Sequence, residues 1–420
     1  MPEGKINLAT YQQVLKELEG KECHLLLGNG FNRALKVKTD YESIFKNMMK
    51  ENAEYLEVKP FLDGEKYDLE KLIGELKSKI PDGEKFLPKF IHNKVKLDFM
   101  KAASKIAASQ VNKIFKEKNE SINLLLKNFT NYFTLNYDPF LYLLLMKFKK
   151  SDNKKKEALA LPQTHLFQAQ EVDDSEKGLY SKIEEVRLSG KIEIHSKAID
   201  DSKDLGACAK TEFKAIVKPY FKKQRYEPLK IDQAIDLLWE NKKENNTLEI
   251  DDAFRQGSLF GELEGEPVYS SNILTQNLFF LHGAFHIYED NKITKKITQT
   301  SDKALYERLE EIISSEEKEI ICIFSNTDKA DEIMTNEYLK SAYEKLSNLS
   351  QNLVIIGSSL AENDNHIFNQ INNSDIQNIY ISTTEKSKMA NLQRSKEVFP
   401  KKDVLFFDAN TISYEKTLAE

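Results

Sequence analysis

The sequence predicts an α/β protein with a doubly wound, Rossmann-like parallel sheet that carries helical insertions. The first observation is that short apolar runs at residues 24–27 and 132–136 each lead into a glycine or polar loop. Strands that are covered on both faces, as in a parallel sheet, have this pattern. The second observation is that strand-like segments in the last third alternate with helical patterns, as in βαβ units. These segments are residues 278–281, 319–324, 353–356, 379–381 and 404–407.

Helix and turn signals account for the segments between these strands. Thr10 and Gln13 form a capping-box pattern, which predicts a helix at the start of the chain. Apolar residues at helical spacing predict a helical insertion over about residues 46–127. Pro139 suits a first helical position and predicts a helix directly after the second strand. Residues 287–297 have the pattern of a local hairpin.

Three regions follow from this order of elements. Residues 1–148 form the first half of the Rossmann-like domain, and residues 276–420 form its second half. Residues 149–275 between them are rich in charge and predict a mainly helical inserted subdomain. Apolar residues near Trp239 keep a helical spacing, which favours a packed subdomain over a linker.

Composition excludes several classes of protein. The 420 residues are 40% hydrophobic and 30% charged, as in ordinary globular proteins. A formal net charge of −6 argues against a general binder of nucleic acid. Three widely spaced cysteines exclude a disulfide scaffold and a four-cysteine zinc site. Without a signal-peptide pattern or an apolar run of about 20 residues, we expect a cytoplasmic protein that does not enter a membrane.

Four polar clusters directly follow predicted strands. In an open parallel sheet, ligands bind beyond the carboxyl ends of the strands, so these clusters are expected to meet at one site. The clusters are Gly28, Asn29, Gly30, Phe31 and Asn32; Asn136 and Asp138; His282 and Gly283; and Gly357, Ser358, Ser359 and Leu360.

Each cluster also has a purely structural interpretation. A Gly-x-Gly pair suits a tight turn between strand and helix, and it lacks the third glycine of the usual dinucleotide fingerprint. An Asn-x-Asp after a strand is a common helix cap. A single histidine at a strand end is often structural, and Gly-Ser-Ser-Leu suits a turn before a capped helix. His282 and His286 lie four residues apart but in a strand-turn context, so no metal site is expected.

Taken in this order, the four clusters resemble the NAD-binding core of the sirtuin superfamily. The resemblance covers roughly residues 20–50, 128–148 and 276–382, and it is closest to divergent bacterial sirtuin-like proteins of antiphage defence, which cleave NAD. It implies a sirtuin-type sheet, with Gly28 and Gly30 against the NAD diphosphate and His282 as the catalytic histidine. It also implies that residues 357–360 contact the phosphate and adenosine side.

Two departures from the sirtuin pattern disfavour protein deacylation. No paired cysteines follow Gly283, so the zinc ribbon of the deacylases is missing. The Gly-Ile-Pro of the sirtuin cofactor loop is also absent. Asp364 and His366 follow the Gly-Ser-Ser-Leu segment. Asn363 or Asp364 suits a helix cap, and the alternative is that this loop closes over the adenosine.

The resemblance therefore predicts an NAD glycohydrolase that needs no metal, with NAD as its substrate. Departure of nicotinamide passes through an oxocarbenium-like state, as in glycoside hydrolysis. His282 is expected to act as the general base, Asn136 to position the ribose or water, and Asp138 to hold the nicotinamide amide.

The family resemblance also predicts an effector of abortive infection, working as a homo-oligomer or with a defence-system partner. Two alternatives remain open from the sequence. One is a sensor that binds NAD or ADP-ribose without catalysis, and the other is an ADP-ribosyl transferase.

Overall fold

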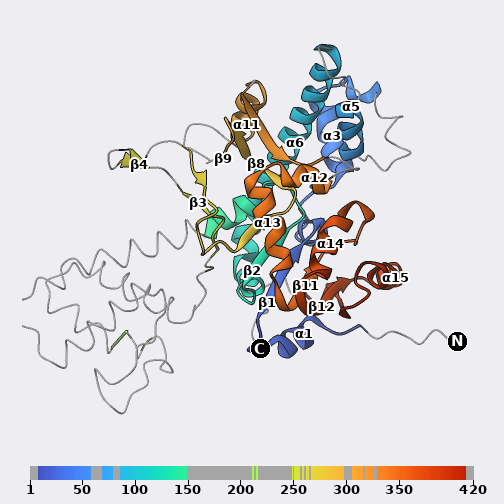
Figure 1. Cartoon of the computed structure of the whole chain (residues 1–420). Helices are drawn as coiled ribbons and strands as arrows, with labels where there is room; N and C mark the ends of the chain where they lie inside the picture. The colour runs from blue at the N-terminus through green and yellow to red at the C-terminus, as the bar shows by residue number, and fades with distance from the viewer. Residues whose placement is uncertain are drawn as a thin grey trace, which may run out of the picture. The chain divides into compact units, whose positions relative to one another are not determined.

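The protein is described from a computed structural model (Figure 1). The chain divides into two units, Met1–Leu144 with Ile250–Glu420, and Leu145–Glu249. The three sheets of the described residues lie in the first unit. The structure describes residues 8–57, 69–78, 86–148, 250–255, 258–259, 262–263, 266–297, 305–315, 317–324 and 329–412, with Thr211, Lys214, Ala215 and Leu248. The predicted helical segment around Trp239 lies outside the described residues.

A six-stranded sheet in which every neighbouring pair is parallel confirms the α/β class. The central strand β1 is buried along its whole length, in keeping with its continuous apolar sequence. In spatial order the sheet runs β13 (Asp403–Asp408), β12 (Asp375–Thr383), β11 (Ser350–Ile356), β1 (Cys23–Leu27), β2 (Asn131–Thr134) and β7 (Leu278–Phe280).

The chain builds this sheet outward in two directions from β1. It first adds β2 and then β7 on one side, crosses to β11 on the other side, and continues through β12 to β13. The direction of growth therefore changes between β1 and β11, where Leu25 lies beside Val354. Such a switch point leaves a crevice at the carboxyl ends of the strands.

Helices of the described chain surround this sheet (Figure 1). The capping box of the first helix is confirmed, since the Thr10 hydroxyl accepts from the Gln13 N–H and the Gln13 side chain accepts from the Thr10 N–H. The helices that precede, follow or connect its strands include α1 (Tyr11–Leu18), α2 (Asn29–Ala34), α12 (Lys329–Met334), α13 (Glu337–Ser347), α14 (Asn365–Asn372) and α15 (Lys388–Val398). Strands and helices share one core, which includes Leu26, Phe133, Leu353, Ile355, Ala342, Leu346, Ile367 and Phe368.

A second, antiparallel sheet corrects the prediction for residues 319–324. This segment forms β10 (Lys318–Cys322), which pairs antiparallel with β8 (Gly283–Asp290) and not with the parallel sheet. A buried apolar strand has the same sequence pattern in either sheet, so the sequence could not separate the two.

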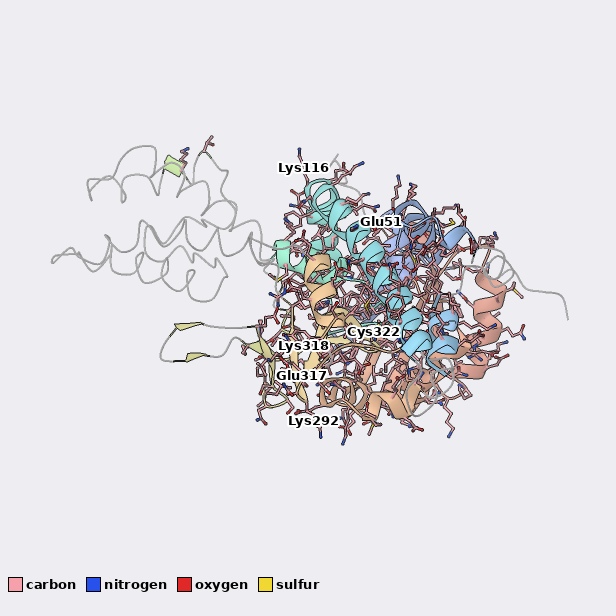
Figure 2. All side chains as sticks on the ribbon, turned by 90° about the horizontal axis from the view of Figure 1, so that it is seen from above. Glu51, Lys116, Lys292, Glu317, Lys318 and Cys322 are labelled. Atoms are coloured by element: carbon pink, nitrogen blue, oxygen red, sulfur yellow. The ribbon has the colours of Figure 1, made fainter. Side chains whose placement is uncertain are left out.

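The hairpin predicted at residues 287–297 is confirmed as β8 and β9 (Ile293–Lys296). Asn291 and Lys292 in its turn both have positive φ, as a two-residue type I′ turn requires. Lys292 in this turn and Lys318 at the start of β10 are labelled in Figure 2.

Part of the segment assigned from sequence to a mainly helical insertion is also strand. β3 (Phe254–Arg255) and β6 (Val268–Tyr269) join the antiparallel sheet through the pairing of Val268 with Lys295. A short hairpin of β4 (Ser258–Leu259) and β5 (Glu262–Leu263) lies between them in sequence. Residues 250–275 therefore belong to the first unit, because the second unit ends at Glu249.

Four further helices pack with the antiparallel sheet around a second core. They are α3 (Tyr41–Glu51), α5 (Leu69–Ser78), α6 (Phe86–Leu126) and α11 (Leu305–Ile313). The Phe99 ring of α6 meets the Phe285 ring of β8 edge-on at 5.7 Å between centroids. In the part of the chain that the structure describes, no helix combines the length and apolar character needed to cross a membrane.

His286 of β8 is a buried histidine whose two ring nitrogens have no hydrogen-bond partner. Its ring stacks on Tyr142 at 3.9 Å between centroids. Burial holds the pKa of His286 well below its ordinary value, and the charge of Lys296 adds to this. The folded state therefore keeps this ring neutral at pH values where the unfolded chain binds a proton.

Replacing His286 with phenylalanine is expected to make folding stability less sensitive to acid. Because its folded pKa is depressed, the stability linked to His286 is present above the unfolded pKa of about 6.5 and is lost as the pH falls below it. Between pH 7.5 and 5.5 the His286→Phe variant should lose about 1 kcal/mol less than the parent. Urea denaturation at the two pH values measures the difference, and equal losses would contradict the buried, neutral state of His286.

Candidate functional site

A cavity of about 990 Å³ opens at the carboxyl edge of the parallel sheet. This volume is at the upper end of the range of about 300–1,000 Å³ that is typical of small-molecule sites. Residues from the loops after β1, β2, β7, β11, β12 and β13 line it. The cavity therefore lies at the switch point between β1 and β11, where the sequence placed the site.

Ten of the predicted site residues line this cavity. They are Gly28, Asn29, Gly30, Asn136, Asp138, His282, Gly357, Ser358, Ser359 and Asp364. Residues of all four clusters therefore come together, although they are spread over more than 300 positions of the chain.

The other five predicted residues do not line the cavity. Phe31 and Leu360 are fully buried as core side chains, and Asn32 is buried behind the cavity wall. Gly283 has φ +74° and packs directly against the Ile321 carbonyl, so it serves the junction between two strands. These four residues therefore pack around the site but do not line the cavity. His366, the fifth, lies next to His282, with 3.1 Å between their Nε2 atoms.

The glycines of the first and last clusters hold two loops in backbone contact. The Gly30 N–H donates to the Gly357 carbonyl at 2.8 Å. A Cβ on Gly28 would lie 2.6 Å from the Gly357 oxygen, and one on Gly357 would lie 2.4 Å from the Phe31 nitrogen. Only glycine fits such an approach.

This contact bears on the expected position of the diphosphate against Gly28 and Gly30. The Gly30 N–H is taken by Gly357, and the Phe31 N–H donates to the Gly28 carbonyl at 3.0 Å. Neither group is available to a phosphate in this conformation. The Gly-x-Gly pattern is explained here by close packing of two backbones.

Asp138 is held in the cavity wall as a helix cap, which was the structural alternative. One carboxylate oxygen accepts from the Phe140 N–H at 2.9 Å, and the other accepts from the Asn32 side chain at 2.8 Å. Burial raises the pKa of Asp138 to about 6, while these hydrogen bonds oppose the rise. Both oxygens already have protein partners, which weakens the predicted role in holding the nicotinamide amide.

Asn136 lies nearer to the open space than Asp138. Its backbone N–H donates to the Thr134 hydroxyl at 3.0 Å, which fixes the turn after β2. The residue is half-buried and lines the cavity. Among the described residues no hydrogen bond engages its carboxamide, so both its donor and its acceptor are available to a ligand.

His282 occupies the junction of β7 and β8 and is only 3% exposed. Its Nε2 lies 3.1 Å from Nε2 of His366 and 3.7 Å from a carboxylate oxygen of Asp364. Its Nδ1 lies 3.4 Å from the Leu135 carbonyl oxygen. Burial, aided by the charges of Lys329 and His366, holds the pKa of His282 well below its ordinary value. The ring is therefore a neutral imidazole near pH 7.

Three basic residues of the cavity were missed by the sequence analysis. Lys329 begins α12 and is only 5% exposed, while Arg33 and Lys386 are exposed. Across the described ranges, Arg33 and Lys386 form no ion pair. No motif marks them, although Lys329 follows the strand-like segment 319–324 as other site residues follow theirs.

A group of hydroxyl side chains at and just beyond the end of β12 was also missed. Ser382, Thr383, Thr384 and Ser387 line the cavity, and Ser382 accepts from the Gly357 N–H at 3.0 Å. The rule that polar residues follow predicted strands applies to this segment as well. Applying this rule to the strand predicted at residues 379–381 would have identified these residues.

The fold and the cavity define an α/β protein with a polar, cation-bearing site at the carboxyl edge of its parallel sheet. A family model described as "Domain of unknown function (DUF4917)" matches residues 233–414. The matched segment contains His282, Lys329 and Gly357 but neither Gly28 nor Asn136. A search of curated proteins gave no match. The family description names no activity, so the resemblance to sirtuins stays a prediction.

No group of three or more His, Cys, Asp or Glu side chains is placed to hold a metal ion within the described part of the chain.

Proposed function

We propose that the protein is an NAD glycohydrolase, which cleaves the bond between nicotinamide and ribose to give nicotinamide and ADP-ribose. The observation that carries the proposal is that neutral His282 and the unengaged carboxamide of Asn136 line one large cavity at the switch point of the sheet. A neutral imidazole carries a lone pair that can accept a proton, which a general base requires.

The strand order supports a doubly wound, Rossmann-like and sirtuin-type sheet as part of this proposal. With the six parallel strands numbered along the chain, their spatial order is 3-2-1-4-5-6 or its reverse. Dinucleotide-binding Rossmann folds have this order and bind their ligand where it reverses.

Basic side chains around the cavity support an anionic ligand such as a dinucleotide. Arg33 and Lys386 are exposed beside the cavity, and Lys329 is buried in its wall. A diphosphate carries negative charge that these side chains can neutralise through charge-assisted hydrogen bonds. We assign the diphosphate to them because the backbone N–H groups of Gly28, Gly30 and Phe31 are already engaged.

The reaction then follows from the groups present. The carbon–nitrogen bond to nicotinamide breaks, and nicotinamide leaves with the electron pair of that bond. Asn136 orients a ribose hydroxyl or the attacking water, and His282 takes a proton as the new carbon–oxygen bond forms. We further propose, from the family resemblance, that the activity serves antiphage defence, with a second copy of the chain or a defence-system partner.

Incubation of purified protein with NAD is expected to release nicotinamide and ADP-ribose in equal amounts, measured by liquid chromatography. Neutralising Arg33 or Lys386 with glutamine should raise KM about 5- to 10-fold with little change in kcat, because each loses one charge contact to the diphosphate. Lys388→Gln is the matched control, since Lys388 pairs with Glu385 and does not line the cavity. Equal KM values for all three variants would contradict the assigned diphosphate position.

One observation favours a second candidate, a sensor that binds NAD without cleaving it. In this conformation both ring nitrogens of His282 face protein atoms, one on His366 and one on Leu135. A sensor needs no free base. Calorimetric NAD binding by a protein that releases no nicotinamide would favour the sensor, and ADP-ribose found on a macromolecule would indicate a transferase.

A further inference from the structure

The cavity extends well beyond the residues assigned to the reaction. Asn136 follows β2, and three strand spacings separate β2 from β12 in the sheet order β12-β11-β1-β2. At about 4.8 Å per spacing, the ends of these two strands are roughly 14 Å apart. Residues that follow β12 and β13 nevertheless line the same cavity. A ligand whose reactive ribose lies at Asn136 therefore reaches the end of β12 only if it has a second arm, as a dinucleotide has.

Asn391 is a buried carboxamide in this second part of the cavity. It lies in the first turn of α15, lines the cavity and is only 6% exposed. Its Nδ2 donates to the Thr383 hydroxyl at 2.9 Å. That hydroxyl donates in turn to the Thr384 carbonyl, so it accepts from Asn391, and this fixes which end of the carboxamide faces Thr383.

The oxygen of this carboxamide is available to a ligand. Within the described part of the chain, no group donates to Oδ1 of Asn391. Since Oδ1 is also not fully enclosed by protein atoms, it faces the cavity that the residue lines. A carbonyl oxygen can only accept hydrogen bonds, so its partner on a ligand must carry an N–H or an O–H.

The surroundings of Asn391 suit a base better than a sugar. Ile412 after β13 lines the cavity and is only 5% exposed, and Ala409 in the same segment adds apolar surface. The groups that suit a ribose or a phosphate, on Thr384 and Lys386, are exposed. A purine has apolar faces and a polar edge, so it matches apolar walls with one buried acceptor.

We infer that Asn391 selects the base of the dinucleotide, with its Oδ1 accepting from the amino group of a 6-aminopurine such as adenine. A 6-oxopurine such as hypoxanthine carries an acceptor at that position, so two oxygens would face each other. This inference rests on the proposed function, which makes an adenine dinucleotide the ligand. Asn391 contacts the base and not the reacting carbon, so it determines specificity.

Calorimetry with ADP-ribose and its hypoxanthine analogue tests the inference without catalysis, because neither compound contains nicotinamide. The parent protein should bind ADP-ribose about 10-fold more tightly than the analogue, since the analogue loses one hydrogen bond and leaves a buried acceptor unpaired. Asn391→Ala should weaken binding of ADP-ribose by about 10-fold and should bind both compounds equally well. An Asn391→Ala protein that keeps the preference of the parent would overturn the inference. Tighter binding of the analogue by the parent would also overturn it, because Nδ2 would then face the base.

Asn410→Ala is the matched control. Asn410 also lines the cavity, but it is exposed and its side chain donates to Asp408. This variant should prefer ADP-ribose as strongly as the parent does. An equal loss of preference in Asn410→Ala and Asn391→Ala would show that the effect does not come from Asn391.

Thr383→Val is the second variant, which keeps the inference testable if Asn391→Ala does not fold. It removes the acceptor of the Asn391 Nδ2 without changing the branched shape of the side chain, so the carboxamide can turn either end toward the base. The preference for ADP-ribose should then fall to about 2-fold or less. A parent-like preference in Thr383→Val would contradict the inference.

These outcomes are separable from a failure of the proposed function. A parent protein that prefers ADP-ribose but releases no nicotinamide from NAD would contradict the glycohydrolase and retain the role of Asn391. A parent protein that releases nicotinamide but binds both compounds equally well would retain the glycohydrolase and contradict the role of Asn391. Absence of ADP-ribose binding would likewise contradict the base pocket.

Discussion

Replacing His282 with alanine is expected to lower the rate of nicotinamide release by about 10²-fold or more, while NAD affinity stays within about 3-fold of the parent value. General-base catalysis typically contributes 10²–10⁴-fold to a rate, which sets the expected size. Binding should persist because the basic residues assigned to the diphosphate, Arg33 and Lys386, remain in place. The loss should therefore fall on kcat, as for an interaction made in the transition state.

The measurement combines chromatographic rates with calorimetric NAD affinity. His286→Phe is the matched control, since His286 is also buried and neutral but lies outside the cavity. It should keep the parent rate near pH 7.5. Undiminished turnover by His282→Ala would exclude His282 as the base. A joint loss of turnover and NAD binding would instead make His282 a structural residue of the cavity.

Much of the fold was predictable because strand ends are local features of a sequence. The apolar run before Gly28 and the one before Asn136 each stop where a buried strand stops. Parallel strands bring their carboxyl ends to one edge of the sheet. Local patterns were therefore enough to predict that Gly28, Asn136, His282 and Gly357 line one cavity. The site follows from the topology of the sheet more than from any single motif.

The contacts within the site were not predictable in the same way. Pairing of His282 with His366 depends on how α14 packs on the sheet, and no local pattern encodes that orientation. The antiparallel pairing of β10 was not predictable either, because buried strands have the same apolar sequence pattern in both sheets. Asp138 shows a third case, in which a motif residue serves mainly as a cap because a buried carboxylate needs donors.

The glycines show that a sequence motif beside a cavity can have a structural reason that the sequence does not reveal. The Gly-x-Gly pattern and Gly357 do lie beside the cavity. Their hydrogen bonds, however, join the two loops to each other, with the Gly30 N–H on the Gly357 carbonyl. Glycine is required there because the two backbones are in contact. Its substitution should therefore lower the stability of the fold before it affects ligand binding.

Replacing Gly357 with alanine is accordingly expected to destabilise the fold by about 3 kcal/mol or more, with loss of NAD binding as a consequence. Two costs add at this position. Its φ of +75° is unfavourable for alanine, and the new Cβ would lie 2.4 Å from the Phe31 nitrogen, which belongs to backbone that cannot swing away.

Two other glycines separate these costs in urea denaturation experiments. Gly20 has φ +72° with no atom within 4 Å of a Cβ, so Gly20→Ala isolates the backbone cost of about 1 kcal/mol. Gly30→Ala isolates the contact, since its Cβ would lie 2.5 Å from the Gly357 Cα without a positive φ. Alanine favours helix at position 30, so a destabilised Gly30→Ala can only reflect the contact between the loops. If Gly357→Ala lost no more stability than Gly20→Ala, the two loops would not need their close approach, and a direct role of these glycines in ligand binding would again be the better explanation.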